Sequence, residues 1–247
     1  MKKRGSFAFK TDIGKVRTTN EDQVVAMVNR HQDILLGVAD GMGGHARGDL
    51  ASRLAMQSLI KGFKNTFGLL TSKTATLWLR QQVVQANRSI YQEAQKSSSL
   101  KEMGTTLVIA LIVNKDLIIL NIGDSRVYLF EDGALTQATE DQTYVEYLYR
   151  QGKITEAQKA NHPQRHVLLN ALGLNTSVSY DVKIVPYHGQ TILVCSDGLY
   201  NNLTEGELSS IIRSKDTPQQ KVDSLINLAN ANGGNDNIAV AIWESER

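Results

Sequence analysis

The sequence predicts an α+β fold in which a β-sheet core is covered by pairs of helices. Short apolar runs that suit strands come in groups, and longer amphipathic stretches that suit helices come in separate pairs. Strands grouped in this way favour α+β over a repeated βαβ unit. The length of 247 residues is enough to bury a full core, and the chain shows no repeat, low-complexity tract or linker. We therefore expect one domain over residues 1–247.

The first half of the chain is expected to alternate between these two patterns. Three strand-like runs lie at 6–14, 22–29 and 33–40. Two helices are expected at about 47–65 and 74–97. The apolar stripe of the second consists of Leu77, Val83, Val84, Ile90, Tyr91 and Ala94. Strands are then expected at 105–113, 116–123, 126–133 and 134–139.

The second half opens with a polar segment at about 141–161 that leans toward helix. Strands are expected at 177–185 and 190–197, and a last strand at 237–243. Two capped helices precede that last strand. Their signals are Thr204 with Glu207, then Thr217, Pro218 and Gln220, with Gly233 and Gly234 as the stop.

Composition excludes several classes of protein. The 27 basic and 25 acidic residues give a net charge of +2, which does not indicate a basic surface for binding nucleic acid. The basic N-terminus lacks the apolar core of a signal peptide, and Asn114, Lys115 and Asp116 interrupt the most apolar region, so we expect no membrane insertion. The lone Cys195 lies in an apolar run and is expected to be a buried, inert thiol. A cytoplasmic protein is the expectation.

Five aspartates lie next to strongly apolar strands, and they are Asp22, Asp40, Asp124, Asp197 and Asp236. A single aspartate at a strand end is usually a turn residue or a helix cap. Five carboxylates brought to one end of a sheet repel one another unless a cation lies between them. All-oxygen ligands without paired His or Cys point to Mg²⁺ or Mn²⁺ rather than zinc.

The stretch "GVADGMGGHARGD", residues 37–49, places glycines beside one of these carboxylates. Glycine lets the backbone approach a metal, so that a carbonyl or a water completes its shell; a tight glycine loop is the alternative. Two metals about 4 Å apart activate a water and clamp a phosphoryl oxygen. Arg17, in "RTTNED", is the candidate phosphate ligand, with an ordinary surface arginine as the alternative.

Several segments together carry a resemblance, and they occur in one order along nearly the whole chain: "RTTNED", "VADGMGGHARGDLAS", "MGTTL", "NIGDSRVYL", "HPQRHVLLNALG", "LVCSDGL" and "GGNDNIAV". In them the sequence resembles the metal-dependent serine/threonine protein phosphatases (type-2C family) in their compact bacterial form. The resemblance implies a four-layer αββα sandwich, with two antiparallel β-sheets flanked by helix pairs. It also implies hydrolysis of phosphoserine and phosphothreonine on proteins by a metal-activated water. The alternative is a catalytically silent phosphoprotein-binding module.

The same resemblance implies a metal site of two Mn²⁺ or Mg²⁺ ions. Asp40 would bridge both metals, the Gly41 carbonyl would ligate the second, and Asp197 and Asp236 would complete the shell of the first. In bacterial relatives a third, weaker metal uses the residue that corresponds to Asp124, together with Asp197. The side chains implied as support around the site are Thr105, Thr106, Ser125 and Asn237.

Catalytic roles follow from the resemblance as well. Glu21 and Asp22 would act mainly through waters of the metals, and Asp22 would orient or deprotonate the attacking water. Arg17 would hold the substrate phosphate. His45 is a candidate general acid for the leaving alkoxide, although its spacing from Asp40 differs from that in relatives with histidine directly after Asp-Gly; otherwise it caps a helix or lines the cleft.

The polar segment at 144–166 matches the flap of the family, which lies beside the active site; a plain surface helix pair is the alternative. Three departures from the usual pattern are mild: Asp49 stands where glutamate is usual, "DQT" at 141–143 replaces "DHS", and Asn170 replaces the arginine of "TRALG". None of them is an implied metal ligand, so we expect an active enzyme. The family also implies phosphoprotein partners, including a membrane serine/threonine kinase of the same bacterium and its targets.

Overall fold

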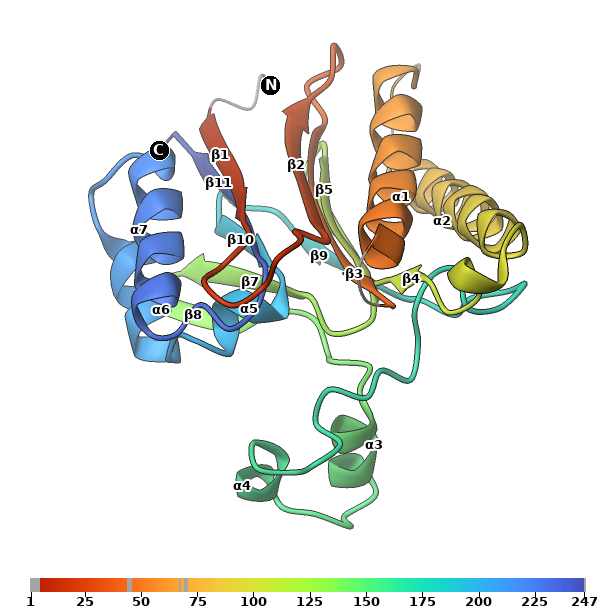
Figure 1. The fold of residues 1–247 in the computed structure, drawn as a ribbon. Helices are drawn as coiled ribbons and strands as arrows, with labels where there is room; N and C mark the ends of the chain where they lie inside the picture. Colours follow the sequence, from red (N-terminus) through yellow and green to blue (C-terminus); the bar gives the residue numbers. More distant parts are fainter. Residues whose placement is uncertain (1–4, 44–45, 67, 69–70, 247) are drawn as a thin grey trace.

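The computed structural model describes residues 5–43, 46–66, 68 and 71–246. Within them, two antiparallel β-sheets pack face to face, and helices cover the outer face of each sheet (Figure 1). This is the four-layer αββα sandwich that the resemblance implied, so the predicted fold class is confirmed. No helix in the described part of the chain is long and apolar enough to cross a membrane.

One sheet has the strand order β1-β11-β10-β7-β8. Its strands are β1 (Gly5–Asp12), β7 (Arg126–Glu131), β8 (Ala134–Gln137), β10 (Thr191–Cys195) and β11 (Ile238–Ser245). The other sheet has the order β2-β3-β5-β6-β9, with β4 paired to β3. Its strands are β2 (Asp22–Val28), β3 (Ile34–Met42), β4 (Gly104–Thr105), β5 (Leu107–Val113), β6 (Asp116–Ile122) and β9 (Asp181–Pro186).

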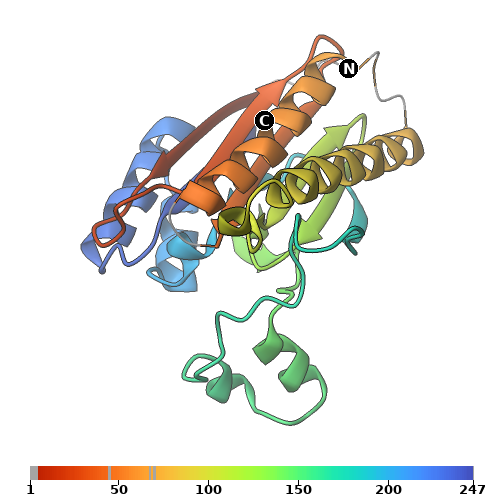
Figure 2. The ribbon, with the colours of Figure 1, turned by 45° about the vertical axis from the view of Figure 1, so that its right-hand side comes forward.

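Helices α1 (Ala46–Lys64) and α2 (Ser72–Ala94) cover the second sheet, and a short 3-10 turn, η1 (Ser98–Leu100), follows them. Helices α6 (Glu205–Arg213) and α7 (Pro218–Ala231) cover the first sheet, together with the short α5 (Asp197–Tyr200). Two further helices, α3 (Tyr144–Arg150) and α4 (Glu156–Lys159), project away from the sandwich in a separate lobe (Figure 2).

Strand β5 explains how an uninterrupted apolar run is used. All seven residues of "LVIALIV" are buried, and they alternate between two layers of the core. Leu107, Ile109 and Leu111 face α1 and α2, whereas Val108 and Ala110 face the other sheet. Burial of each such aliphatic side chain contributes roughly 1.5–3 kcal/mol. A strand in the middle of a four-layer fold therefore has no polar face.

The predicted caps of the last two helices are confirmed. Thr204 and Glu207 exchange backbone-to-side-chain hydrogen bonds of 2.8 and 3.3 Å at the start of α6. Thr217 and Gln220 do the same at the start of α7, and the positive φ angles of Gly233 and Gly234 end that helix as predicted.

Two details of the prediction are wrong. Leu77 and Val84 do not lie on the buried stripe of α2, since they are 50% and 58% exposed; the buried face instead includes Ala75, Leu79 and Ala86. The strand expected over 177–185 begins only at Asp181. Asp181 pairs with Asn121 near the end of β6, so the residues before it lie beyond the part of β6 that is available for pairing.

Candidate active site

The five aspartates singled out in the sequence lie at one end of the sandwich. Asp22 begins β2 and pairs directly with Asp40 of β3. Asp197 follows β10, as the first residue of α5 rather than the end of a strand, and Asp236 precedes β11. Asp124 lies in the turn between β6 and β7. Their charges act on one another, because each of Asp22, Asp124, Asp197 and Asp236 raises the pKa of at least one other carboxyl in the group.

The backbone of Asp40 is held on both sides, which leaves its carboxylate free to face the cluster. Its N–H donates to Thr106 Oγ1 at 2.9 Å, and its carbonyl accepts from Thr105 Oγ1 at 2.9 Å and from the Thr106 N–H at 2.9 Å. Thr106 Oγ1 in turn lies 2.9 Å from Ser125 Oγ. Three of the side chains expected to support the site therefore lie where they could do so.

Asp22 is 1% exposed and is fixed by Ser196, a residue that sequence reasoning did not single out. Ser196 Oγ donates to Asp22 Oδ2 at 2.6 Å and accepts from the Ala239 N–H at 2.9 Å. One hydroxyl thus connects β2 to the β10–α5 junction and to β11. The available signal was its position directly before Asp197, but its partner is 174 residues away in the chain.

Glu21 is buried against the start of α1. Asn237 Oδ1 accepts from its N–H at 2.8 Å, and its carbonyl accepts from Ser52 Oγ at 2.6 Å. A Cβ at Gly48 would collide with the Glu21 carboxylate, and one at Gly41 would collide with the Gly48 carbonyl. The glycines at these positions therefore allow α1 to approach the carboxylates closely.

Burial and mutual repulsion raise the pKa values of these carboxyls. The pKa of Asp22 rises to about 8, first because the group is buried, although its hydrogen bond from Ser196 lowers it. Burial, followed by the charge of Asp236, raises the pKa of Asp197 to about 6. Burial also raises the pKa values of Asp40 and Asp124 well above their ordinary range. Full ionisation of the cluster is therefore unfavourable unless additional positive charge lies beside it.

Arg17 provides part of the missing positive charge. Its Nη2 lies 2.8 Å from Asp236 Oδ2, and half of its side chain remains exposed. A groove of about 1000 Å³ runs past this pair; its lining includes Arg17, Asp40, Asp197, Asp236, Arg165 and His166. An exposed guanidinium beside a carboxylate cluster is suitably placed to bind a phosphate.

A divalent cation suits this donor set. The available ligands are oxygen atoms, and Asp40 is close enough to hydrogen-bond with Asp22 and with Asp197. Among the described residues, no three His, Cys, Asp or Glu side chains already surround a common point as a preformed metal cage. The fit therefore rests on oxygen chemistry and on uncompensated negative charge.

The histidines give a mixed result. His45 lies outside the described residues, so its candidate role stays a prediction. His166 is exposed but lines the groove, and its pKa is lowered by partial burial and then by Arg165. Cys195 is fully buried, as predicted, and burial raises the pKa of its thiol to about 12, so it is no nucleophile.

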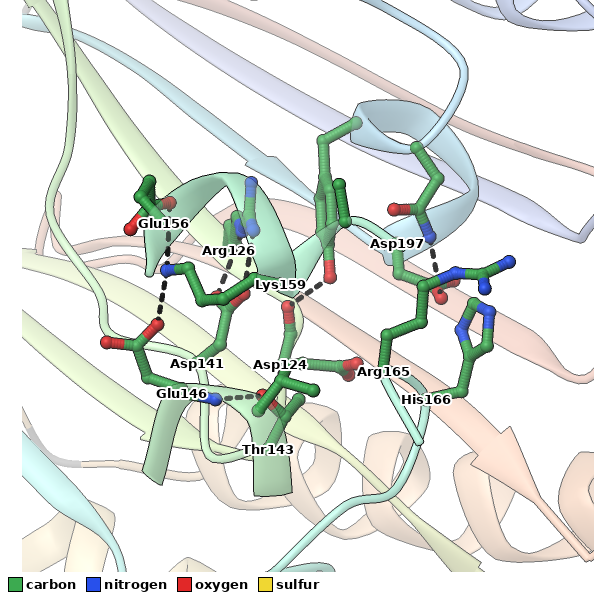
Figure 3. A pocket seen from close by; sticks show the side chains of 14 residues that line it. Asp124, Arg126, Asp141, Thr143, Glu146, Glu156, Lys159, Arg165, His166 and Asp197 are labelled. Carbon is green, nitrogen blue, oxygen red and sulfur yellow. Dashed lines mark hydrogen bonds and ion pairs between the residues drawn. The ribbon is translucent and has the colours of Figure 1, made fainter. Parts of the chain in front are cut away.

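A second cavity, of about 280 Å³, lies beside the groove and under the α3–α4 lobe (Figure 3). Arg126 and Asp141 form a bidentate salt bridge there, in which Nε donates to Oδ1 at 2.9 Å and Nη2 donates to Oδ2 at 2.6 Å. The Arg126 guanidinium carbon also lies 3.5 Å from the centroid of the Tyr200 ring. Tyr200 Oη donates to the Asp124 carbonyl at 3.0 Å. Sequence reasoning missed these three residues because only the fold brings them together.

The family model for protein phosphatase 2C matches residues 15–239. The chain belongs to the protein phosphatase 2C family. A serine/threonine phosphatase, stp, of Listeria monocytogenes is 41% identical over 239 residues, which cover 96% of this chain and 95% of the relative. The protein phosphatase PhpP of Streptococcus pneumoniae is 33% identical over 233 residues and 94% of each chain.

Solved structures agree with this assignment. The serine/threonine phosphatase of S. agalactiae superposes with a TM-score of 0.92 at 32% identity, over 98% of this phosphatase and 100% of that chain. The catalytic domain of PstP, solved in complex with two manganese ions, superposes with a TM-score of 0.86 at 32% identity, over 98% and 99% of the two chains. The chain is thus a serine/threonine protein phosphatase, and a silent binding module is not favoured.

Proposed function

We propose that this phosphatase hydrolyses phosphoserine and phosphothreonine on proteins with two divalent cations, Mn²⁺ or Mg²⁺, held at the carboxylate cluster. The observation that carries the proposal is the set of buried carboxyls whose pKa values are raised by burial and by one another. Repulsion of this kind is costly unless cations bind. The similarity to PstP, whose structure holds two manganese ions, supports the same number of ions here.

The residues proposed to hold the cations are those at the sandwich end. Asp40 would bridge the two, the Gly41 carbonyl would contact the second, and Asp197 and Asp236 would contact the first. Glu21 and Asp22 would contact them indirectly, and Asp124 with Asp197 would form a third, weaker site. When bound, such cations neutralise charge and supply an activated water.

The protein's own groups would carry the remaining chemistry. Asp22, held by Ser196, would orient the attacking water or accept its proton. Arg17 would leave Asp236 partly or wholly to bind the phosphate. The water oxygen would form the new bond to phosphorus, the bond to the serine or threonine oxygen would break, and that oxygen would take up a proton. His45 is the candidate donor of that proton.

We also propose the domain, the partners and the compartment in which this activity takes place. We infer one catalytic domain over 1–247, with the flap at 144–166 beside the groove; Arg165 and His166 lie where groove and flap meet. The expected partners are phosphoproteins, including a membrane serine/threonine kinase and its targets, in the cytoplasm. Surface groups of the site, rather than the fold itself, determine which phosphoproteins bind.

The test is hydrolysis of a phosphothreonine peptide against Mn²⁺ concentration, for the intact chain and for Asp40→Asn. We expect turnover that requires metal, and a loss of about 100-fold or more in the variant. Asp49→Asn is the matched control, because Asp49 pairs with Arg53 on the exposed side of α1. Absence of turnover by the folded intact chain at every metal concentration would falsify the enzymatic proposal and favour the binding module.

A further inference from the structure

The two ends of the flap meet in a narrow neck. The Tyr144 N–H donates to the Val167 carbonyl at 2.8 Å, and the Leu169 N–H donates to the Gln142 carbonyl at 2.8 Å. Thr143 and Leu168 form a β-bridge between these two bonds. The flap therefore enters and leaves the sandwich at one point, which limits how it can move as a unit.

Gln142 holds this neck to the sandwich. Its Oε1 accepts from the Gly123 N–H at 2.9 Å and from Asn170 Nδ2 at 2.7 Å. Its Nε2 donates to Asp181 Oδ2 at 2.7 Å and to the Asn121 carbonyl at 3.3 Å. Its backbone N–H donates to the Gly123 carbonyl at 3.0 Å. One side chain thus joins the flap's entry, its exit, the start of β9 and the turn after β6.

That turn carries Asp124. Gly123 has a φ of +95°, a conformation that favours glycine, and a Cβ there would press on the Thr106 side chain at 2.6 Å. Thr106 also holds Asp40. The turn therefore lies between the Asp40 support on one side and Gln142 on the other, with little freedom to shift.

Asn170 completes the arrangement on the exit side. Besides its bond to Gln142, its Nδ2 donates to the Ser179 carbonyl at 2.8 Å. Gln142 and Asn170 are also two of the positions at which this chain departs from the pattern of the family it resembles. Because the two side chains bond to each other, the departures form one contact rather than two isolated changes.

We propose that Gln142 and Asn170 are positioning residues that fix the flap relative to Asp124 and to the substrate groove. The inference rests on the proposed function, since it concerns how a phosphoprotein is bound. The flap and its exit supply Ala160, Arg165 and His166 to the groove, so a loosened neck misplaces the wall against which a peptide packs. A small aryl phosphate occupies only the carboxylate end and does not need that wall.

The experiment compares Asn170→Ala, Gln142→Ala and the double variant on two substrates, a phosphothreonine peptide and p-nitrophenyl phosphate, at saturating Mn²⁺. We expect the KM for the peptide to rise about three- to tenfold in each single variant. The KM for p-nitrophenyl phosphate stays within about twofold in Asn170→Ala, which leaves Gly123 bonded to Gln142. The effect of the double variant stays below the product of the two single effects, because both substitutions remove the same Gln142–Asn170 hydrogen bond.

Gln137→Ala is the matched control, since Gln137 bonds to Asp141 and Thr139 near the neck but to neither flap end. A lower kcat on both substrates with unchanged KM values would indicate a merely structural role and overturn the proposal. Additive effects of the two substitutions would also overturn it. If Gln142→Ala does not fold, Asn170→Ala alone decides. An intact chain inactive on both substrates contradicts the proposed function instead.

Discussion

At the scale of single residues, the site combines charged side chains with neutral side chains that hold them in place. Asp22 and Arg17 could be picked out because five carboxylates lie beside apolar strands with an arginine near them, although one aspartate or one arginine alone would have an ordinary role. Ser196 and Tyr200 could not, since a serine or tyrosine acquires such a role only through partners far away in the chain. Supports of this kind are therefore harder to predict than the charged groups, although the resemblance did imply Thr105, Thr106 and Ser125.

Arg17 allows a sharp test at this scale. Its guanidinium faces Asp236 and the groove, where two parallel N–H groups could bind one phosphate. Arg17→Lys keeps the charge but loses that geometry, so we expect kcat/KM for the phosphopeptide to fall about 10- to 100-fold. Steady-state kinetics at saturating Mn²⁺ measures it. Arg30→Lys, in the β2–β3 turn at the opposite end of β2, should leave activity unchanged; equal effects of both changes would exclude phosphate binding by Arg17.

At the scale of elements, regular patterns were predictable and their three-dimensional context was not. Local signals were sufficient for the caps of α6 and α7 and for the strand β5. Each of these elements was predicted correctly. The stripe of α2 was misjudged because apolar side chains at Leu77 and Val84 lie on the solvent side, which no local rule forbids. The strand predicted over 177–180 was wrong for a different reason: β6 has ended there, so these residues have no part of β6 to pair with.

At the start of α1, Gly48 lies directly against Glu21 and Gly41 of the site. A methyl group at Gly48 would meet the Glu21 carboxylate and come within 2.7 Å of the Gly41 backbone. We expect Gly48→Ala to push α1 away from the site, lower the unfolding free energy by about 1–3 kcal/mol, and weaken Mn²⁺ binding. Denaturant melts and calorimetric metal titration measure these effects.

Gly206→Ala in α6 is the matched control for that change. The nearest neighbour of the added methyl group would be Thr204 Oγ1 at 4.0 Å, so the group meets open space. Alanine is also the better helix former, and stability should stay constant or rise slightly. Normal Mn²⁺ affinity in Gly48→Ala would show that the close approach of α1 does not shape the metal site.

At the scale of the whole molecule, the sandwich concentrates like charges at one end of two sheets. The strand ends meet there because antiparallel strands return to the same edge, and the register sets Asp22 opposite Asp40. The fold thus buries carboxyls that repel one another, and part of its stability is given up to hold them ready for cations. Stability and function should therefore depend jointly on pH and metal.

The pH dependence of the metal-free protein follows from the raised pKa values. The pKa of Asp22 is about 8 in the fold, mainly through burial, against about 3.9 in an unfolded chain. The folded state consequently binds more protons between these values, so stability is highest near pH 4 and falls as the pH rises toward 8. Asp197, with a pKa of about 6, adds to the loss between pH 4 and 6. His166, whose pKa is lowered mainly by burial, acts in the opposite direction near pH 6 but is one largely exposed group.

We therefore expect the melting temperature of the protein in EDTA to fall by on the order of 5 °C between pH 5 and pH 8. Saturating Mn²⁺ should remove most of that fall, because cations bind the deprotonated carboxylates of the folded state and raise its stability most at high pH. Asp40→Asn should flatten the curve in EDTA, since it removes one carboxyl whose pKa the fold raises. A melting temperature that rises with pH in EDTA, or a Mn²⁺ effect that is equal at pH 5 and pH 8, would mean that these carboxyls do not share an uncompensated site.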